Sequence, residues 1–176
     1  MCVMFTHHAA WLIFCWLYIM SQIHIFSVGR WKKGPEKTLY EHFQDRLQWN
    51  VMLHQLDDKA SSFLTPQQVQ QNQAEKLLNA LAKNNSFYRI ALDERGQQLT
   101  STELATLMQQ CFNRSQIPAF LIGGDHGLRA DLVTSSKQTL AFGKATWPHL
   151  LILGMLMEQL YRAQQILIGH PYHRGG

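Results

Sequence analysis

The 176-residue sequence predicts an α/β fold, with a mostly parallel sheet flanked by helices. The alternation of elements supports this fold class, and composition and length support a single globular domain. Short apolar runs alternate with helical patterns from residue 21 onward, as in proteins built from strand–helix units. Hydrophobic residues make up 46% of the chain and charged residues 16%, which is typical of a globular protein rather than a disordered one. The length is sufficient for one well-packed core and short for two.

The first half of the domain contains two predicted strands and two predicted helices. Apolar runs over residues 23–28 and 51–56 predict the strands. Apolar residues at every fourth position across residues 39–47 predict the helix between them. The sequence TPQQ, which begins at Thr65, combines an N-cap threonine, a proline at the first helical position and a glutamine that closes a capping box. This signature predicts a helix that runs to about residue 81.

The second half continues the alternation. The sequence TSTE at residues 100–103 is a second capping box and predicts a helix to about Phe112. A buried strand over 117–122 is predicted after it, followed by two glycines. The other predicted elements are a strand over 87–92, a turn over 93–96, a short helix carrying Leu128, Leu132 and Val133, a strand over 139–142 and a helix over about 148–168.

Residues 1–20 differ from the rest of the chain. They contain twelve consecutive apolar residues, which is shorter than the roughly 20 that a membrane span requires, and neither lysine nor arginine precedes Arg30. We therefore interpret 1–20 as an extension outside a domain that covers 21–176, and the alternative is a membrane anchor. The three scattered cysteines fit a reducing compartment and lack the spacing of metal ligands, so we predict a cytoplasmic protein with no metal site. Because the apolar run is too short for a membrane span, we predict no membrane association. The net charge of +4 permits a nucleic-acid partner.

Three segments follow predicted strands in the second half, where open α/β sheets bind ligands. They are the region around Leu92, the glycine loop GGDHG at residues 123–127, and residues 142–147. Glycines allow a backbone to approach a ligand closely. The loop lacks the lysine and hydroxyl residue of a P-loop and the spacing of a dinucleotide-binding fingerprint. The residues alone therefore predict a ligand site at this edge of the sheet without naming the ligand.

Several motifs together resemble the ribosomal RNA large subunit methyltransferase H family, within the SPOUT superfamily. They are FLIGGDHGL, TWPHLL, EQLYRA and GHPYHR in this order, preceded by IFSVGR and IALDERGQQLTSTELA. The resemblance covers residues 21–174. It implies an α/β trefoil knot near the C-terminus, a homodimer and S-adenosylmethionine as the methyl donor. The implied reaction is methylation of N3 of a pseudouridine in the helix 69 loop of 23S ribosomal RNA, on assembled ribosomes.

The resemblance also implies which residues form the site. The implied cofactor-binding residues are Leu92, Gly123, Phe142, Gly143, Lys144, Ala145, Thr146 and Trp147. The implied catalytic residues are Arg162, His170, Tyr172 and His173. Either histidine is a candidate for the proton acceptor, because imidazole titrates near neutral pH. Tyr172 would contact the base, and Arg162 and Arg174 would hold phosphate or the base edge. The alternative for Arg162 is an ion pair with Glu158, four residues earlier on one helix.

The sequence departs from the family at Leu153, where an arginine is usual. If that arginine orders the tail or contacts RNA, the protein is a weakened or inactive RNA-binding relative, which is the alternative function. A membrane-tethered protein of another function is a third possibility, and it requires residues 1–20. The basic residues near the first helix either contact phosphates or form a solvated face. They are Arg30, Lys32, Lys33, Lys37 and Arg46.

Overall fold

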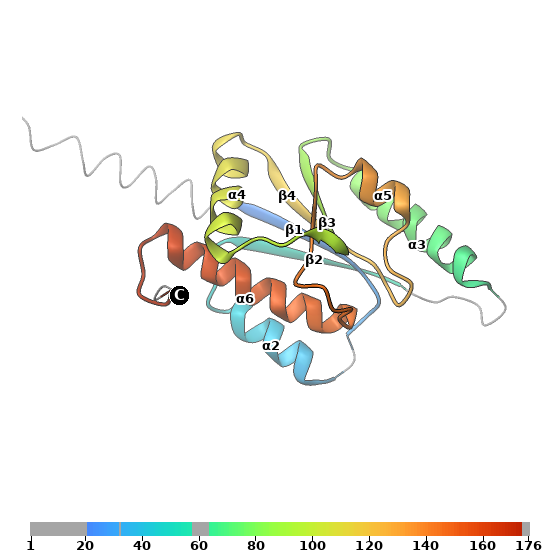
Figure 1. The fold of residues 1–176 in the computed structure, drawn as a ribbon, viewed down its shortest axis with the longest axis horizontal. Helices are drawn as coiled ribbons and strands as arrows, with labels where there is room; N and C mark the ends of the chain where they lie inside the picture. The colour runs from blue at the N-terminus through green and yellow to red at the C-terminus, as the bar shows by residue number, and fades with distance from the viewer. Residues whose placement is uncertain (1–20, 32, 58–63, 174–176) are drawn as a thin grey trace, which may run out of the picture.

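The computed structural model describes residues 21–31, 33–57 and 64–173. Within them, five strands form one sheet in the order β2-β1-β4-β3-β5, and every pair of neighbours is parallel (Figure 1). The predicted α/β class is therefore confirmed, with a sheet that is wholly parallel. The strands are β1 (Gln22–Val28), β2 (Asn50–Leu56), β3 (Phe87–Gln97), β4 (Ile117–Ile122) and β5 (Gln138–Leu140). The helices are α2 (Pro35–Gln44), α3 (Pro66–Leu81), α4 (Ser101–Asn113), α5 (Ala130–Ser135) and α6 (His149–Leu167).

Both predicted capping boxes are present. The Thr65 hydroxyl accepts a hydrogen bond from the backbone N–H of Gln68, and the Gln68 side chain accepts one from the Thr65 N–H. Thr100 and Glu103 make the same reciprocal pair at the start of α4. Each box satisfies backbone donors that the first turn of a helix leaves without partners. These caps fix where α3 and α4 begin.

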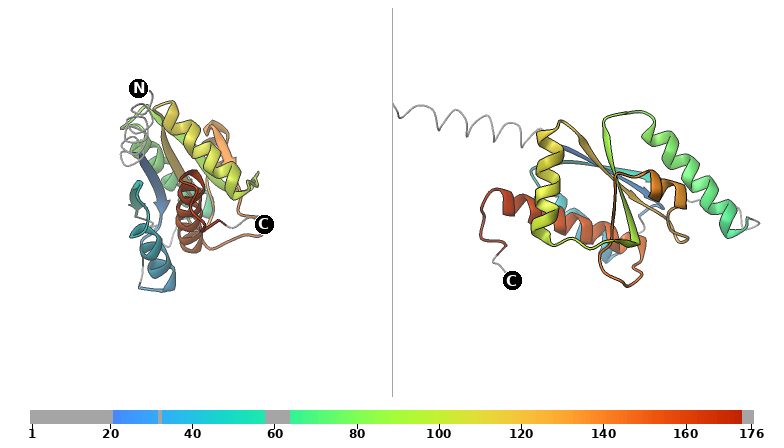
Figure 2. Two further views of the ribbon diagram at one scale, coloured as in Figure 1. Left: turned by 90° about the vertical axis from the view of Figure 1, so that its left-hand side faces the viewer. Right: turned by 45° about the horizontal axis from the view of Figure 1, so that its top comes forward.

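Helices cover both faces of the sheet (Figures 1 and 2). On one face, buried side chains of α2, α4 and α6 pack against Ile25, Ile90 and Phe120. On the other face, α3 and α5 pack against strand residues that include Phe26 and Leu121. Alternate residues of each central strand therefore point into opposite cores, as burial on both faces requires. Helix α6 lies against both α2 and α4.

The predicted turn over residues 93–96 is wrong, because β3 continues through it to Gln97. Beyond Leu92 the strand leaves its regular register and pairs again at Gln97 with Leu140. Gly96 permits this path: a Cβ atom there would lie 2.6 Å from the carbonyl carbon of Leu140. The Asp93 carboxylate accepts hydrogen bonds from the side chain and the backbone N–H of Arg95, so two charged residues are accommodated within the strand.

Three smaller expectations about element ends also differ from the structure. Helix α2 stops at Gln44, before Leu47, and Leu128 precedes α5 instead of lying in it. Strand β5 ends at Leu140, so Phe142 lies in the segment that leaves the sheet. The apolar residues concerned are buried or half-buried all the same, and burial from a loop produces the same sequence signal as burial from a helix or strand.

No helix in the described part of the chain is both long enough and apolar enough to cross a membrane. Residues 1–20, for which we predict an extension, lie outside the described residues.

Candidate functional site

A cavity of about 770 Å³ lies at one edge of the sheet, beside the start of α6. Three apolar side chains from neighbouring strands contribute to its lining. Leu92 of β3 lies in register with Ile122 of β4 on one side and with Leu140 of β5 on the other. Because all the strands are parallel, their carboxyl ends meet here, which is where such sheets bind ligands.

The glycine loop forms one wall of this cavity. Gly124 and Gly127 pair as an antiparallel bridge, and the Gly127 N–H donates to the Gly124 carbonyl at 2.9 Å. The tight turn leaves no room for a side chain at Gly123, where a Cβ atom would lie 2.3 Å from the carbonyl carbon of Gly127. Gly127 has a φ of +69°, a conformation that favours glycine. The glycines at positions 123 and 127 are therefore required by the backbone of the loop itself.

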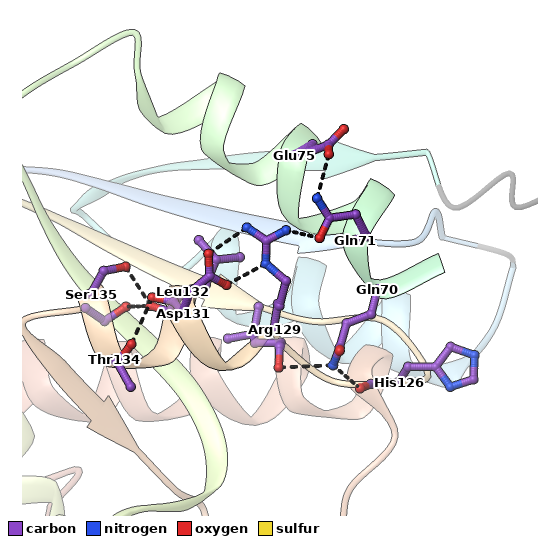
Figure 3. Close-up of polar contacts among 11 residues, drawn as sticks. Gln70, Gln71, Glu75, His126, Arg129, Asp131, Leu132, Thr134 and Ser135 are labelled. Carbon is purple, nitrogen blue, oxygen red and sulfur yellow. Dashed lines mark hydrogen bonds and ion pairs between the residues drawn. The ribbon is translucent and has the colours of Figure 1, made fainter. Parts of the chain in front are cut away.

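Helix α3, which packs on the sheet face opposite to α6, contacts the same loop (Figure 3). The Gln70 side-chain amide donates to the backbone carbonyls of His126 and Leu128, at 3.0 and 3.2 Å. Beside it, the Gln71 side-chain oxygen accepts a hydrogen bond from the guanidinium of Arg129. Gln70 also lines the cavity. Two consecutive glutamines thus connect α3 to the loop between β4 and α5.

Residues 142–147 form the opposite wall. The Trp147 indole N–H donates to the Phe142 carbonyl at 3.1 Å, which closes the segment into a loop. Gly143 has a φ of +108°. The Thr146 hydroxyl donates to the Glu94 carboxylate at 2.5 Å and ties this loop to the extension of β3. Glu94 is thus a site residue that sequence reasoning missed, since the predicted turn would have placed it outside the sheet.

The lining of the cavity has more carboxylates than cations: four carboxylates stand against one arginine, Arg95, and two histidines. Its carboxylates are Glu36, Asp93, Glu94 and Asp125. Hydrogen bonds from Arg95 hold the pKa of Asp93 below its ordinary value, so that carboxylate is ionised and paired. Asp125 lies 3.3 Å from Nδ1 of His149, the first residue of α6. An acidic cavity in a chain of net charge +4 favours a cationic small molecule over a nucleic-acid phosphate.

Seven of the eight predicted cofactor residues line this cavity, and the Lys144 side chain, which is exposed, does not. The expected cofactor fits the residues present. The volume lies within the range of roughly 300–1,000 Å³ that is typical of small-molecule sites. The floor is apolar, glycines bring the backbone to the ligand, and the carboxylates suit the positive sulfonium of S-adenosylmethionine. Within the described residues, no three histidine, cysteine or carboxylate side chains are grouped as metal ligands would be.

The predicted catalytic residues lie in a second cluster. Nε and Nη2 of Arg162 donate to one carboxylate oxygen of Glu158, at 2.9 and 2.6 Å, so the alternative pairing proposed from the sequence is present. The Tyr172 hydroxyl donates to the same oxygen at 3.2 Å. Burial and the Glu158 carboxylate raise the pKa of Tyr172 above its ordinary value of 10.0. Tyr172 is therefore a neutral hydrogen-bond donor here.

The two histidines of the tail are in different environments. Nδ1 of His170 accepts the backbone N–H of Tyr172 at 3.2 Å. A neutral imidazole has one acceptor nitrogen, so His170 in this state carries its proton on Nε2. His173 is half-buried, and its Nδ1 has no hydrogen-bond partner among the described residues. Arg174 lies outside the described part of the chain.

The cavity and the tail lie at opposite ends of α6 (Figure 1). The segment that forms the cavity wall leads into the start of this helix, and residues 169–173 follow its end. A helix of 19 residues spans about 28 Å. The structure therefore keeps the two predicted parts of the site apart within one chain.

Leu153, at the position where we expect the family to carry an arginine, is buried. Leu153 is 0% exposed and packs in the core formed by α2, α4 and α6. In this chain its side chain faces neither the cavity nor solvent, so the change falls on a packing position.

Two of the basic residues near α2 form ion pairs within the chain: Arg30 pairs with Asp57 at 2.6 Å, and Lys37 with Glu41 at 3.3 Å. Lys32 lies outside the described residues.

Comparisons with known proteins agree with the motifs. The family described as predicted SPOUT methyltransferase matches residues 21–173. The ribosomal RNA large subunit methyltransferase H of Rhodospirillum centenum is 39% identical over 154 residues, covering 87% of this chain and 99% of that relative. The protein of the same name from Zymomonas mobilis is 40% identical over 157 residues, covering 88% and 99%. Among solved structures, a probable methyltransferase from Bordetella pertussis has a TM-score of 0.54 at 13% identity, covering 84% of this chain and 98% of that one, which supports the fold alone.

Proposed function

Because the chain belongs to the ribosomal RNA large subunit methyltransferase H family of SPOUT methyltransferases, we propose that it methylates N3 of a pseudouridine in the helix 69 loop of 23S ribosomal RNA. The observation that carries this proposal is the cavity at the strand ends, whose glycine loop and opposite wall suit the family's cofactor, S-adenosylmethionine. When bound, that cofactor supplies a methyl group activated by a sulfonium sulfur. The substrate is the loop on the assembled ribosome.

We propose that the active unit is a homodimer in the cytoplasm. One chain holds its cavity and its tail at opposite ends of α6, so it does not complete a site by itself. A two-fold dimer repeats both parts and can place the tail of one subunit over the cavity of the other. The trefoil knot belongs to the same proposal, and family membership supports it.

In the transfer, the bond between N3 and the methyl carbon would form as the bond from the sulfonium sulfur to that carbon breaks, with S-adenosylhomocysteine as the leaving group. The tail residues would accept the proton that leaves N3. His173 is our candidate acceptor, because the acceptor nitrogen of neutral His170 already binds the Tyr172 N–H. Tyr172 stays protonated and would contact the base from the tail. The Arg162 guanidinium lies over the Tyr172 ring and would stabilise the negative charge that develops on the base. Positioning supplies much of the remaining rate.

The test is methylation of ribosomes from cells that lack this gene. Purified protein and labelled S-adenosylmethionine should add one methyl group to the pseudouridine, detected by mass analysis and by a primer-extension stop at a blocked base-pairing edge. His173→Asn should lose about 100-fold or more in rate, while the matched His170→Asn should lose less than about tenfold. Ribosomes that stay unmodified with wild-type protein would contradict the proposed function and leave an RNA-binding relative.

A further inference from the structure

One arginine from outside α6 reaches the tail cluster. Arg46 follows the end of α2, and its Nη2 donates to the Tyr161 hydroxyl at 2.8 Å. Its guanidinium carbon lies 4.4 Å from the centre of the Tyr161 ring and 5.7 Å from that of Tyr172. The two rings meet edge to face, with centres 4.8 Å apart. Arg46 therefore contacts both aromatic residues, of which one belongs to the helix and one to the tail.

Tyr172 is held from a second direction as well. The guanidinium carbon of Arg162 lies 4.8 Å from the centre of the Tyr172 ring, and the Glu158 carboxylate accepts a hydrogen bond from the Tyr172 hydroxyl. Glu158 also binds Arg162, so the carboxylate and its arginine form one unit on α6. The ring of Tyr172 is thus bounded by two cations, one carboxylate and a second ring. Cation–π attraction and edge-to-face packing both favour this arrangement.

We infer that Arg46 is a positioning residue that docks the C-terminal tail on its own subunit. The inference rests on the proposed function only in assigning the tail to catalysis. Arg46 connects the tail to the segment that follows α2, whereas the other contacts of Tyr172 named above come from α6. A tail held in this way is already ordered before it meets the cavity of a second subunit, which lowers the entropy cost of assembling the site.

The contacts of Arg46 argue against the alternative role of a phosphate ligand. In addition to the hydrogen bond with Tyr161, Nη1 of Arg46 lies 3.3 Å from Nε2 of His42. Its guanidinium packs against the rings of Tyr161 and Tyr172 and is within hydrogen-bonding distance of two side chains of its own chain, the Tyr161 hydroxyl and the His42 ring. A phosphate contact contributes to the salt dependence of RNA binding, and a positioning residue does not. This difference separates the two roles experimentally.

The experiment compares Arg46→Met and Arg46→Lys in the full-length protein, with Arg114→Met as a matched loss of an exposed arginine. Hydrogen exchange of residues 169–173 should become several-fold faster in Arg46→Met and remain unchanged in Arg114→Met. The kcat for ribosome methylation should fall about 10- to 100-fold in Arg46→Met, with the Kd for S-adenosylmethionine within about twofold of wild type. Arg46→Lys should fall between wild type and Arg46→Met in both the hydrogen exchange of the tail and the kcat, because lysine keeps the cation.

Two results would overturn the inference. One is unchanged exchange of the tail in Arg46→Met. The other is a weaker affinity for ribosomes with a flatter dependence on salt, which would identify Arg46 as a phosphate contact. If wild-type protein methylates no ribosomal RNA, the proposed function fails, and the exchange measurement still decides whether Arg46 docks the tail.

Discussion

At the scale of single residues, two histidines on neighbouring strands make the stability of the protein depend on pH. His24 of β1 and His54 of β2 share a hydrogen bond of 2.9 Å, and both rings stack with Phe26. Burial, with the neighbouring His54 as a second cause, lowers the pKa of His24 below its ordinary value of 6.5. Burial, followed by Lys83, lowers the pKa of His54 in the same way. The folded state therefore binds fewer protons than the unfolded state just below pH 6.5.

We predict that the protein loses stability as the pH falls below about 6.5, where the unfolded state takes up protons that the folded state refuses. The melting temperature should drop by about 3 °C or more between pH 7.5 and pH 5.5. His54→Gln, which keeps a polar side chain that does not titrate, should reduce this drop. His126→Gln, at an exposed histidine, should leave it unchanged. Equal drops in all three proteins would contradict the assignment to the strand pair.

Single residues also show where sequence reasoning stops. The Glu158–Arg162 pair was predictable because both residues lie one turn apart on one helix. The contacts of Arg46 with Tyr161 and Tyr172 were not, since they join positions more than a hundred residues apart. No local pattern distinguishes an arginine that packs on distant aromatic rings from one on a solvated face, so Arg46 was grouped with its basic neighbours.

At the scale of secondary-structure elements, the glycine loop depends on α3 for its conformation. We predict that Gln70→Glu, which removes the donors to the carbonyls of residues 126 and 128, weakens S-adenosylmethionine binding about tenfold. Calorimetric titration measures this directly. Gln67→Glu introduces the same charge on an exposed position of the same helix and should change the Kd less than about twofold.

Melting temperatures decide how a positive result is interpreted. If Gln70→Glu binds weakly and melts close to wild type, the glutamine acts on the loop and not on the stability of the fold. A large fall in melting temperature, or equal binding by both variants, would contradict this role for α3.

The elements themselves were largely predictable, because each has a local signal. Capping boxes at Thr65 and Thr100 fixed two helix starts, and apolar runs marked the strands. The extension of β3 was not predictable: DERG has the composition of a turn, and the segment is extended here because Gln97 pairs with Leu140 of a distant strand while Gly96 leaves room for its close approach. The position of the cavity was predictable from the strand ends. The contacts of α3 and Glu94 with its walls were not, because they join residues that are distant in the sequence.

At the scale of the whole molecule, separation of cavity and tail predicts complementation between two defective subunits. Leu92→Arg would fill the cavity and oppose a cationic ligand, and Tyr172→Ala combined with His173→Ala would remove the tail chemistry. Each homodimer should be inactive. A mixed dimer, isolated with two different tags, should regain about half of the wild-type rate, because one cavity and one tail are intact in it.

Inactive mixed dimers that bind S-adenosylmethionine and melt like wild type would show instead that each site draws on one chain alone. Size measurement in solution provides the control, since a monomeric protein would contradict the dimer from the outset.

The parallel sheet also sets the order in which the chain can fold. Strand β1 lies between β2, which follows it closely in sequence, and β4, where His24 pairs with Ala119. Every parallel neighbour requires a crossover, and closing long loops is slow and costly in entropy. A growing chain that ends before Ile122 lacks the strand that completes the centre of the sheet. Until then the unpaired backbone N–H and C=O groups along this edge of β1 stay open to other chains, and protection by a chaperone matters most in that interval.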